Sequence, residues 1–253
     1  TARERGYDCE LLCPQEVTTT FPATNPAAPL GGLLSRQETL IEPGQALARI
    51  TSFLEESLDV EFYFDTEVLN AAAPLVETSR GRLTADRVLV CSGADFETLF
   101  PDVFRESGII RCKLQMMKTS PQPPGWQLGA MITDSLAFRS YPVFQECESS
   151  RSMQERILSE HEDLDRLGIT VFAAQNSKGE IITGDSHHYA ARPPLEDDPG
   201  IDEKISEHLH AMLEIPRPEI AARWSAVYPA HPHRSELVED ATDPADRKST
   251  RLN

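Results

Sequence analysis

The chain has 253 residues, of which 40% are hydrophobic and 26% charged, and this composition is typical of a folded globular protein. Its formal net charge of −17 argues against nucleic acid and anionic membranes as partners, because no excess of Lys and Arg is present to bind them. No apolar run approaches the roughly 18 residues of a transmembrane helix, and we expect no signal peptide. The five cysteines are odd in number and form no CxxC pair, which favours reduced thiols in a cytoplasmic protein.

Both ends of the chain are unusual. Residues 1–7 resemble the last turn of a helix that Gly6 ends, so we expect that helix to begin upstream. Residues 246–253 are basic and polar, unlike the acidic body, and we expect residues 234–253 to be a disordered or artefactual tail. The chain is therefore expected to be a fragment, truncated at both ends.

In chain order, we expect a short strand or helix start within 9–17, an ordered surface loop over 18–32, a short strand over 33–40 and a helix over 44–58. Glu42-Pro43-Gly44 marks the start of this helix, since Pro is favoured in the first turn. Apolar residues then recur at helical spacing: Leu47, Ile50, Leu54 and Leu58.

Short strands are predicted after this helix. Residues 59–64 alternate apolar and polar side chains, which indicates a strand, and residues 66–69 form a second one. Residues 75–78 and 82–84 predict a hairpin around Ser79-Arg80-Gly81.

The run Val88-Leu89-Val90-Cys91 predicts a buried strand, because an uninterrupted apolar run of this length is typical of a parallel sheet. Ser92 and Gly93 close the run, and a glycine there lets a ligand approach the backbone closely. In open α/β sheets, ligands bind at this end of the strands. A buried strand followed by an ordinary turn is the alternative.

The second half of the chain alternates strands and helices. In chain order, we expect strands over 109–117 and 136–144, a helix over 153–167, a hairpin of 169–175 and 179–184 around Asn176-Ser177-Lys178-Gly179, a helix over 201–213 and a strand over 223–228.

This order of elements resembles a known family. The segments Glu42-Pro43-Gly44, Asp65-Thr66-Glu67-Val68 and Ala85–Ala94 look like the middle of an FAD-dependent amine oxidase of the D-amino acid oxidase and glycine oxidase superfamily. The strings Cys-Lys-Leu-Gln-Met, Gly-Asp-Ser-His and Tyr-Pro-Val-Phe resemble the subgroup that accompanies phosphonate-degradation genes. The resemblance covers about residues 1–233, and it rests on the order of the segments.

The resemblance implies an α/β (α+β) fold. It would combine a partial FAD-binding Rossmann-like domain with a substrate domain that has a mixed, mostly antiparallel sheet and flanking helices. Residues 1–41 would be part of the substrate domain and connecting loops, residues 42–102 the middle of the FAD-binding domain, and residues 103–233 the substrate-binding domain.

The resemblance also implies a cofactor site. FAD would contact the backbone of Val68 and the turn of Ser92, Gly93 and Ala94. The family's GxGxxG turn, which holds the pyrophosphate at a helix N-terminus, does not occur in this sequence, and neither does the Gly-rich segment against the isoalloxazine ring. We therefore expect the chain by itself to hold FAD poorly and to be inactive.

One departure from the family bears on the substrate. Typical members carry Gly-Leu-Arg-Pro, whose Arg binds the substrate carboxylate through two hydrogen bonds, whereas this chain has Ala-Val-Tyr-Pro with Tyr228 at the Arg position. We expect a small amine with a different anionic group, such as an aminophosphonate, or an amino acid. Arg139 and His187 are candidate anion contacts, although a solvated strand charge and a turn histidine are the alternatives.

The same residues allow other functions. His187, His188, His231 and His233 could in principle bind zinc, but adjacent strand residues point to opposite faces and no HExxH motif is present. A non-catalytic binding module is a further alternative. A flavin enzyme needs little protein acid/base chemistry, so no catalytic residue is assigned, and the oligomeric state is left open.

Overall fold

The structure, a computed structural model, describes residues 6–140 and 148–234. The chain divides into two compact units. Unit 1 consists of Thr1–Ile41, Lys113–His188 and Pro194–Ala226, and unit 2 consists of Glu42–Cys112, Tyr189–Pro193 and Val227–Asn253. The string Tyr-Pro-Val-Phe and residues 235–253 of the expected tail over 234–253 lie outside the described residues.

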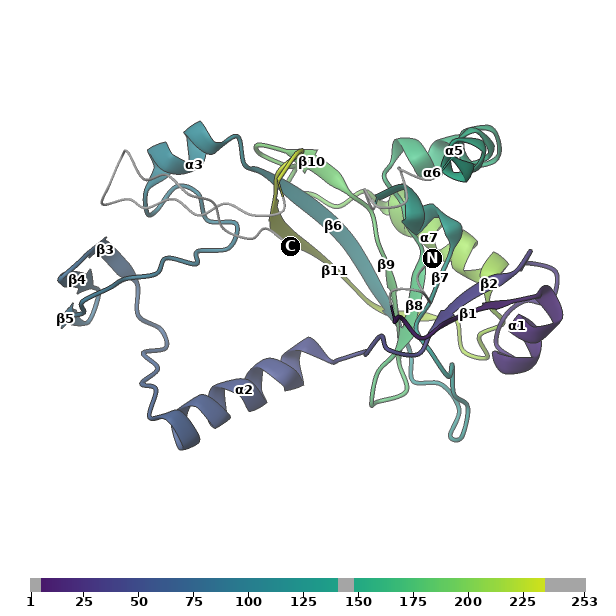
Figure 1. Cartoon of the computed structure of the whole chain (residues 1–253), viewed down its shortest axis with the longest axis horizontal. Coiled ribbons are helices and arrows are strands. Elements are labelled where there is room, and N and C mark those ends of the chain that lie inside the picture. Colours follow the sequence, from purple (N-terminus) through teal and green to yellow (C-terminus); the bar gives the residue numbers. More distant parts are fainter. Residues whose placement is uncertain (1–5, 141–147, 235–253) are drawn as a thin grey trace. The chain divides into compact units, whose positions relative to one another are not determined.

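A six-stranded sheet contains the longest strands of the chain (Figure 1). Its order is β10 (His188–Ala190), β6 (Ile110–Thr119), β9 (Ile181–Gly184), β8 (Phe172–Gln175) and β7 (Ile132–Thr133), and β11 (Ile220–Ala230) also pairs with β6. The pairs β6–β9, β9–β8 and β8–β7 are antiparallel. Together with the helices, this sheet confirms the expected α/β (α+β) class.

The hairpin of β8 and β9 forms where the sequence predicts it. Asn176 fixes its turn, since its side-chain oxygen accepts hydrogen bonds from the backbone N–H groups of Lys178 and Glu180, both at 3.0 Å. Short polar side chains that bond to nearby backbone in this way are typical of turns.

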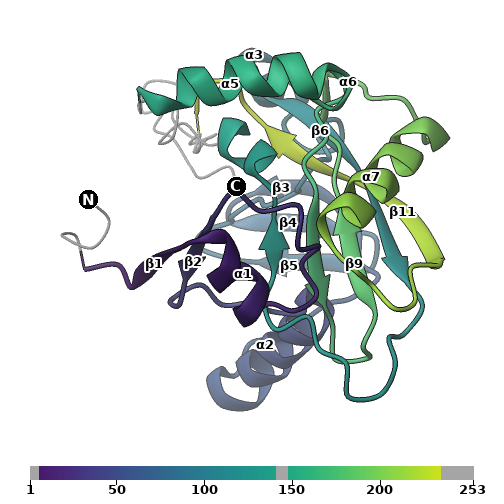
Figure 2. The ribbon, with the colours of Figure 1, turned by 90° about the vertical axis from the view of Figure 1, so that its right-hand side faces the viewer.

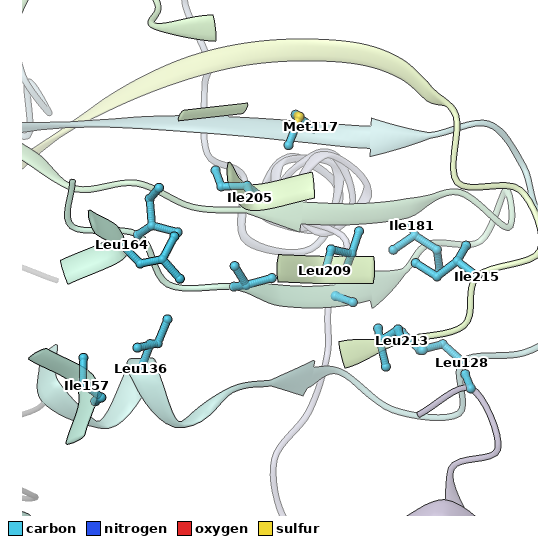
Figure 3. Packing of buried hydrophobic residues seen from close by; sticks show 14 residues of the cluster. Met117, Leu128, Leu136, Ile157, Leu164, Ile181, Ile205, Leu209, Leu213 and Ile215 are labelled. Carbon is cyan, nitrogen blue, oxygen red and sulfur yellow. The ribbon is translucent and has the colours of Figure 1, made fainter. Parts of the chain in front are cut away.

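Helices cover the sheet within unit 1 (Figure 2). They are the 3₁₀-helix η2 (Ser135–Ser140) and the α-helices α5 (Ser149–Glu160), α6 (Glu162–Arg166) and α7 (Pro199–Met212). Their apolar faces and the sheet enclose one core, whose labelled members Figure 3 shows together. Fully buried members include Met117 from β6, Ile181 from β9, and Ile205 and Leu209 from α7.

The polar side chains on the buried face of β6 hold the start of α7. Nζ of Lys113 lies 2.6–3.1 Å from the carbonyl oxygens of 194–196 and 2.8 Å from Oδ1 of Asp197. Gln115 donates to Oδ1 of Asp202 at 2.9 Å. These buried polar groups are paired, as the cost of burying them requires.

The beginning of the chain adds a small separate sheet to unit 1. Strand β1 (Cys9–Leu12) pairs antiparallel with β2 (Gly32–Ser35), and helix α1 (Pro14–Thr20) lies between them in the chain. Strand β2 covers part of the strand expected over 33–40.

Unit 2 begins with helix α2 (Pro43–Leu58), which confirms the helix predicted after Glu42. An antiparallel sheet follows, made of β3 (Val68–Ala72), β4 (Leu75–Thr78) and β5 (Gly81–Thr84). Strand β3 covers the end of the strand expected over 66–69, and β4 and β5 are the predicted hairpin. Helix α3 (Pro101–Ser107) then leads into β6.

Two strands predicted in unit 2 do not form. Residues 59–64 are irregular, and they are bracketed by Asp59 and Asp65 in the left-handed conformation. Residues 88–91 are also irregular, and the side chain of Leu89 is 92% exposed. Both patterns carry the composition of a strand, but among the described residues no neighbouring strand pairs with either segment.

The elements of unit 1 differ from expectation at two places. Residues 136–140 form part of η2 and not a strand, because Asp134 accepts a hydrogen bond from the N–H of Leu136 and starts a helical turn. The helix expected over 153–167 is split into α5 and α6 at His161, whose φ of −140° breaks the helical geometry.

The strands predicted over 109–117 and 223–228 and the helix predicted over 201–213 are confirmed as β6, β11 and α7. Within the described residues, none of the helices has the length and hydropathy needed to span a membrane.

Candidate functional site

The predicted cofactor turn is well defined in unit 2. The N–H of Asp95 donates to the carbonyl of Ser92 at 3.1 Å, and the hydroxyl of Ser92 donates to the carbonyl of Asp95 at 2.8 Å. Gly93 has a φ of +60°, a conformation that residues with a Cβ rarely adopt. The turn therefore closes on itself around Gly93.

The backbone at Gly93 is open. A Cβ placed on this glycine would meet no atom within 4 Å. The turn thus satisfies one requirement of a flavin nucleotide site, which is a stretch of backbone that a ligand can approach closely. The sequence contains no GxGxxG turn, which in such folds binds the pyrophosphate. The residues present therefore fit a contact with the nucleotide part of FAD and not the pyrophosphate-binding turn.

Val68 lies apart from this turn in the hydrogen-bond network. It begins β3 opposite Thr78, and the pairing shifts register between Val68 and Asn70. Within the described residues, no hydrogen bond joins Val68 to Ser92, Gly93 or Ala94. Its predicted contact with FAD stays a prediction.

Tyr228 lies on β11 and is half-buried. Its phenol forms side-chain hydrogen bonds with Cys112, which is fully buried on β6, and with Tyr189 on β10. Burial, and then these two hydrogen bonds, raise the pKa of Tyr228 well above its usual range. A tyrosine phenol is already neutral at physiological pH, and this shift holds it further from ionisation.

Arg139 of unit 1 is engaged by its neighbours. Its Nη1 lies 2.7 Å from Oδ1 of Asp165, and its Nη2 donates to the carbonyl of Ile169. Only 13% of its side chain is exposed. Arg139 therefore forms a mostly buried ion pair with Asp165 within unit 1, so the alternative of a solvated strand charge is wrong.

His187 follows β9 in unit 1. Its Nδ1 lies 3.0 Å from the carbonyl of Gly168, so this nitrogen is the donor, and 3.8 Å from Oδ1 of Asp185. Burial raises the pKa of Asp185, and the nearby His187 opposes that shift. Gly168 fits tightly at this point, since a Cβ on it would lie 2.6 Å from the carbonyl oxygen of His187.

The metal alternative finds no support. Within residues 6–140 and 148–234, no group of three or more His, Cys, Asp and Glu side chains is arranged to hold a metal ion. The rings of His231 and His233 meet edge to face with their centres 6.2 Å apart. None of the four described cysteines, Cys9, Cys13, Cys91 and Cys112, forms a disulfide.

Cys112, Tyr189 and Arg111 were not predicted from the sequence. Arg111 donates from Nε to the carbonyl of Ala94 at 2.9 Å. A signal for it was present, because an arginine inside the apolar run Ile-Ile-Arg-Cys requires a polar partner when the strand is buried. The partner itself lies seventeen residues away and has no sequence signature.

The chain is similar in fold to several solved structures. Glycine oxidase from Geobacillus kaustophilus is 15% identical, with a TM-score of 0.66 over 98% of this chain and 57% of that chain. L-proline dehydrogenase from P. horikoshii is 14% identical, with a TM-score of 0.65 over 94% of this chain and 57% of that chain. NikD, an unusual amino acid oxidase essential for nikkomycin biosynthesis, is 13% identical, with a TM-score of 0.64 over 96% and 59%.

The chain thus spans less than three fifths of the length of each of these relatives. At such identities the likeness shows the fold alone. A search of curated proteins finds no match. The family model described as "DAO: FAD dependent oxidoreductase" matches residues 1–247, nearly the whole chain, and the chain therefore belongs to this family of FAD-dependent oxidoreductases.

Proposed function

We propose that the protein containing this chain oxidises the C–N bond of a small amine. The observation that carries the proposal is the family match over residues 1–247. The similar structures include a glycine oxidase, an L-proline dehydrogenase and an amino acid oxidase, which supports an amine or amino acid substrate. When bound, FAD accepts a hydride from the carbon next to nitrogen, and the protein orients the substrate.

We assign the predicted FAD-contacting residues to unit 2. Backbone of Val68 and of the turn Ser92-Gly93-Ala94 would face the nucleotide part of FAD, and the open backbone at Gly93 supports this role. Residues 42–102 would be the middle of the FAD-binding domain. Residues 1–41 and 103–233 would form the substrate domain.

Tyr228 is proposed to contact the substrate. A tyrosine phenol is neutral at physiological pH, so it offers a hydrogen bond without a positive charge. A carboxylate gains more from an arginine, which provides both charge and two parallel donors. The tyrosine therefore favours an amine whose anionic group is not a simple α-carboxylate, such as an aminophosphonate, and it is consistent with membership of the phosphonate-associated subgroup.

Arg139 and His187 remain proposed anion contacts in unit 1. Arg139 would have to exchange Asp165 for the substrate, because its guanidinium already bonds that carboxylate and the carbonyl of Ile169. His187 keeps Nδ1 on Gly168, so its contact with an anion would be through the other ring nitrogen in the protonated form. His187 is therefore the better candidate of the two.

We further propose that the chain of 253 residues is inactive by itself, since it lacks the GxGxxG turn, and that the protein is cytoplasmic. The activity is tested on the protein as its gene encodes it. That protein should be purified yellow, and an amine substrate should bleach its flavin absorbance under anaerobic conditions. A colourless protein that takes up no FAD would refute the proposal.

The substrate proposal has a separate test. Tyr228→Arg should raise turnover of glycine and other α-amino acids relative to aminophosphonates, because it restores a charged donor pair. Tyr228→Phe is the matched control, which removes the hydroxyl and adds no charge. The proposal fails if the wild-type protein already oxidises α-amino acids efficiently and Tyr228→Arg brings no gain.

A further inference from the structure

Arg111 joins several segments of unit 2 through its side chain. It lies near the start of β6, with its side chain 14% exposed, and its guanidinium bonds two other segments of the unit. Nε donates to the carbonyl of Ala94 and Nη1 to the carbonyl of Ala191, both at 2.9 Å, and Nη2 donates to the carboxylate of Glu97. All three nitrogens of the planar fork are therefore used, each on a different acceptor.

The same side chain packs on the loop that follows the cofactor turn. The guanidinium carbon lies 4.4 Å from the centre of the Phe96 ring, within the range of a cation–π contact. Phe96 is buried and stacks on Phe104 of α3 with ring centres 5.1 Å apart. The guanidinium of Arg111 thus contacts the loop in two ways: its N–H groups donate hydrogen bonds, and its planar face packs against the Phe96 ring.

Hydrogen bonds within residues 94–98 constrain the loop that Arg111 contacts at Ala94 and Glu97. Oδ1 of Asp95 accepts from the N–H groups of Glu97 and Thr98, both at 3.0 Å. The hydrogen bond from Arg111 is the main cause of the lowered pKa of Glu97, which agrees with the ion pair between the two side chains. A constrained loop held at Ala94 also fixes the neighbouring Gly93, whose backbone is open to a ligand.

We propose that Arg111 is a positioning residue for the flavin cofactor, which holds the turn Ser92-Gly93-Ala94 in place against β6. This inference rests on the proposed function, in which that turn forms a wall of the FAD site. Arg111 does not contact the cofactor in this proposal. Lysine cannot replace it, because a single ammonium lacks the fork that reaches Ala94, Ala191 and Glu97 together.

The test uses Arg111→Lys and Arg111→Met in the protein as its gene encodes it. Arg105→Met is the matched control, since Arg105 lies in the same unit, is 71% exposed and pairs with Asp102 at the surface. Three quantities are measured: the Kd for FAD from flavin fluorescence, the KM for the amine, and hydrogen exchange of the amides of 94–98. Thermal unfolding reports whether each variant is folded.

Arg111→Met should weaken FAD binding by at least about tenfold, which is the effect of losing one charge-assisted hydrogen bond. Exchange of the amides of 94–98 should accelerate, while the KM for the amine at saturating FAD stays within about twofold of wild type. Arg111→Lys should show the same pattern to a smaller degree, and it serves as the folded variant if Arg111→Met unfolds. Arg105→Met should match wild type.

An unchanged Kd for FAD in a folded Arg111 variant would overturn the inference and leave the proposed function intact. An equal loss of FAD affinity in Arg105→Met would also overturn it, because the effect would then be one of charge alone. If the wild-type protein binds no FAD, the proposed function fails, and the cofactor role of Arg111 fails with it.

Discussion

The two units of this chain are stabilised in different ways. Unit 1 encloses a cluster of buried apolar side chains from β6, β8, β9, α5, α6 and α7. In unit 2, helix α2 has an apolar stripe, yet within the described residues none of its side chains is buried, and Leu47 is 65% exposed. Unit 2 is held by hairpin pairing, turn hydrogen bonds and the contacts of Arg111.

Because of this difference, we expect mutations in unit 1 mainly to change stability and mutations in unit 2 mainly to change cofactor binding. The core of unit 1 should control the free energy of unfolding, since buried apolar area is the main stabilising contribution in proteins. The loop and turn contacts of unit 2 should control cofactor binding. Both tryptophans, Trp126 and Trp224, belong to unit 1, so tryptophan fluorescence reports its unfolding.

The largest effect is expected in the core of unit 1. Leu209→Ala removes a side chain that is 1% exposed and leaves a cavity between α7 and the sheet, so it should destabilise unit 1 by about 2–5 kcal/mol. Denaturant unfolding followed by tryptophan fluorescence measures this change. Leu47→Ala on α2 is the matched control, followed by circular dichroism because both tryptophans belong to unit 1, and should cost less than about 0.5 kcal/mol. Equal costs for the two variants would contradict the comparison.

A similar but smaller loss is expected at Lys113. Lys113→Met removes a buried ammonium that donates to the carbonyls of 194–196 and pairs with Asp197, and the loss of these charge-assisted hydrogen bonds should cost about 1.5–3 kcal/mol. The same fluorescence assay measures it. Lys178→Met, at an exposed turn position, is the control and should be nearly neutral. A neutral Lys113→Met would show that this network does not hold the start of α7.

Glycine-to-alanine substitutions are also expected to affect stability differently in the two units. Gly184→Ala places a Cβ 2.5 Å from Sδ of Met116 and 3.1 Å from the carbonyl oxygen of Gln115, so it should destabilise by about 1–3 kcal/mol. Gly44→Ala in the first turn of α2 meets no atom within 4 Å and should be neutral or slightly stabilising. Thermal unfolding of both variants measures this difference. An unchanged stability of Gly184→Ala would argue against close contact between Gly184 of β9 and the neighbouring strand β6.

The smallest effect concerns pH. Burial raises the pKa of Asp185, so the unfolded state ionises this carboxyl at a lower pH than the folded state does. The contribution of Asp185 to stability should therefore fall as pH rises from the ordinary aspartate pKa through the raised one, and then stay constant. Asp185→Asn should lack this fall, so the variant should gain stability relative to wild type over that window.

This difference is measured as the free energy of unfolding of unit 1 against pH for the two proteins. The comparison cancels the carboxylates whose pKa is lowered, such as Glu180 beside Lys118, because both proteins contain them. A difference that does not change with pH would contradict the assignment of a raised pKa to Asp185.

Local patterns in the sequence predicted much of the fold. Helix α2 and the hairpins β4–β5 and β8–β9 depend on spacing and turn residues within one segment, and they form where expected. The strand predicted over 88–91 was wrong because a strand also needs a neighbour, which a periodic pattern does not specify. The family and the cofactor followed from the order of segments, and the family match confirms them.

The site was predictable only in part. The turn at Gly93 could be located because glycine after an apolar run is a local feature. The contacts of Arg111 with Ala94 and of Tyr228 with Cys112 join segments that are distant in the chain, and they depend on how the strands pair. Such tertiary contacts have no signature in a single sequence, so their residues appear only in the structure.

We propose that the turn of Ser92-Gly93-Ala94 in unit 2 forms part of the FAD site. The most direct measurement is hydrogen exchange of the gene-encoded protein with and without bound FAD. We predict that the amides of 92–94 and of Val68 gain protection when FAD binds, while the core of unit 1 changes little. Protection confined to other segments, or FAD binding without any change at 92–94, would contradict the claim.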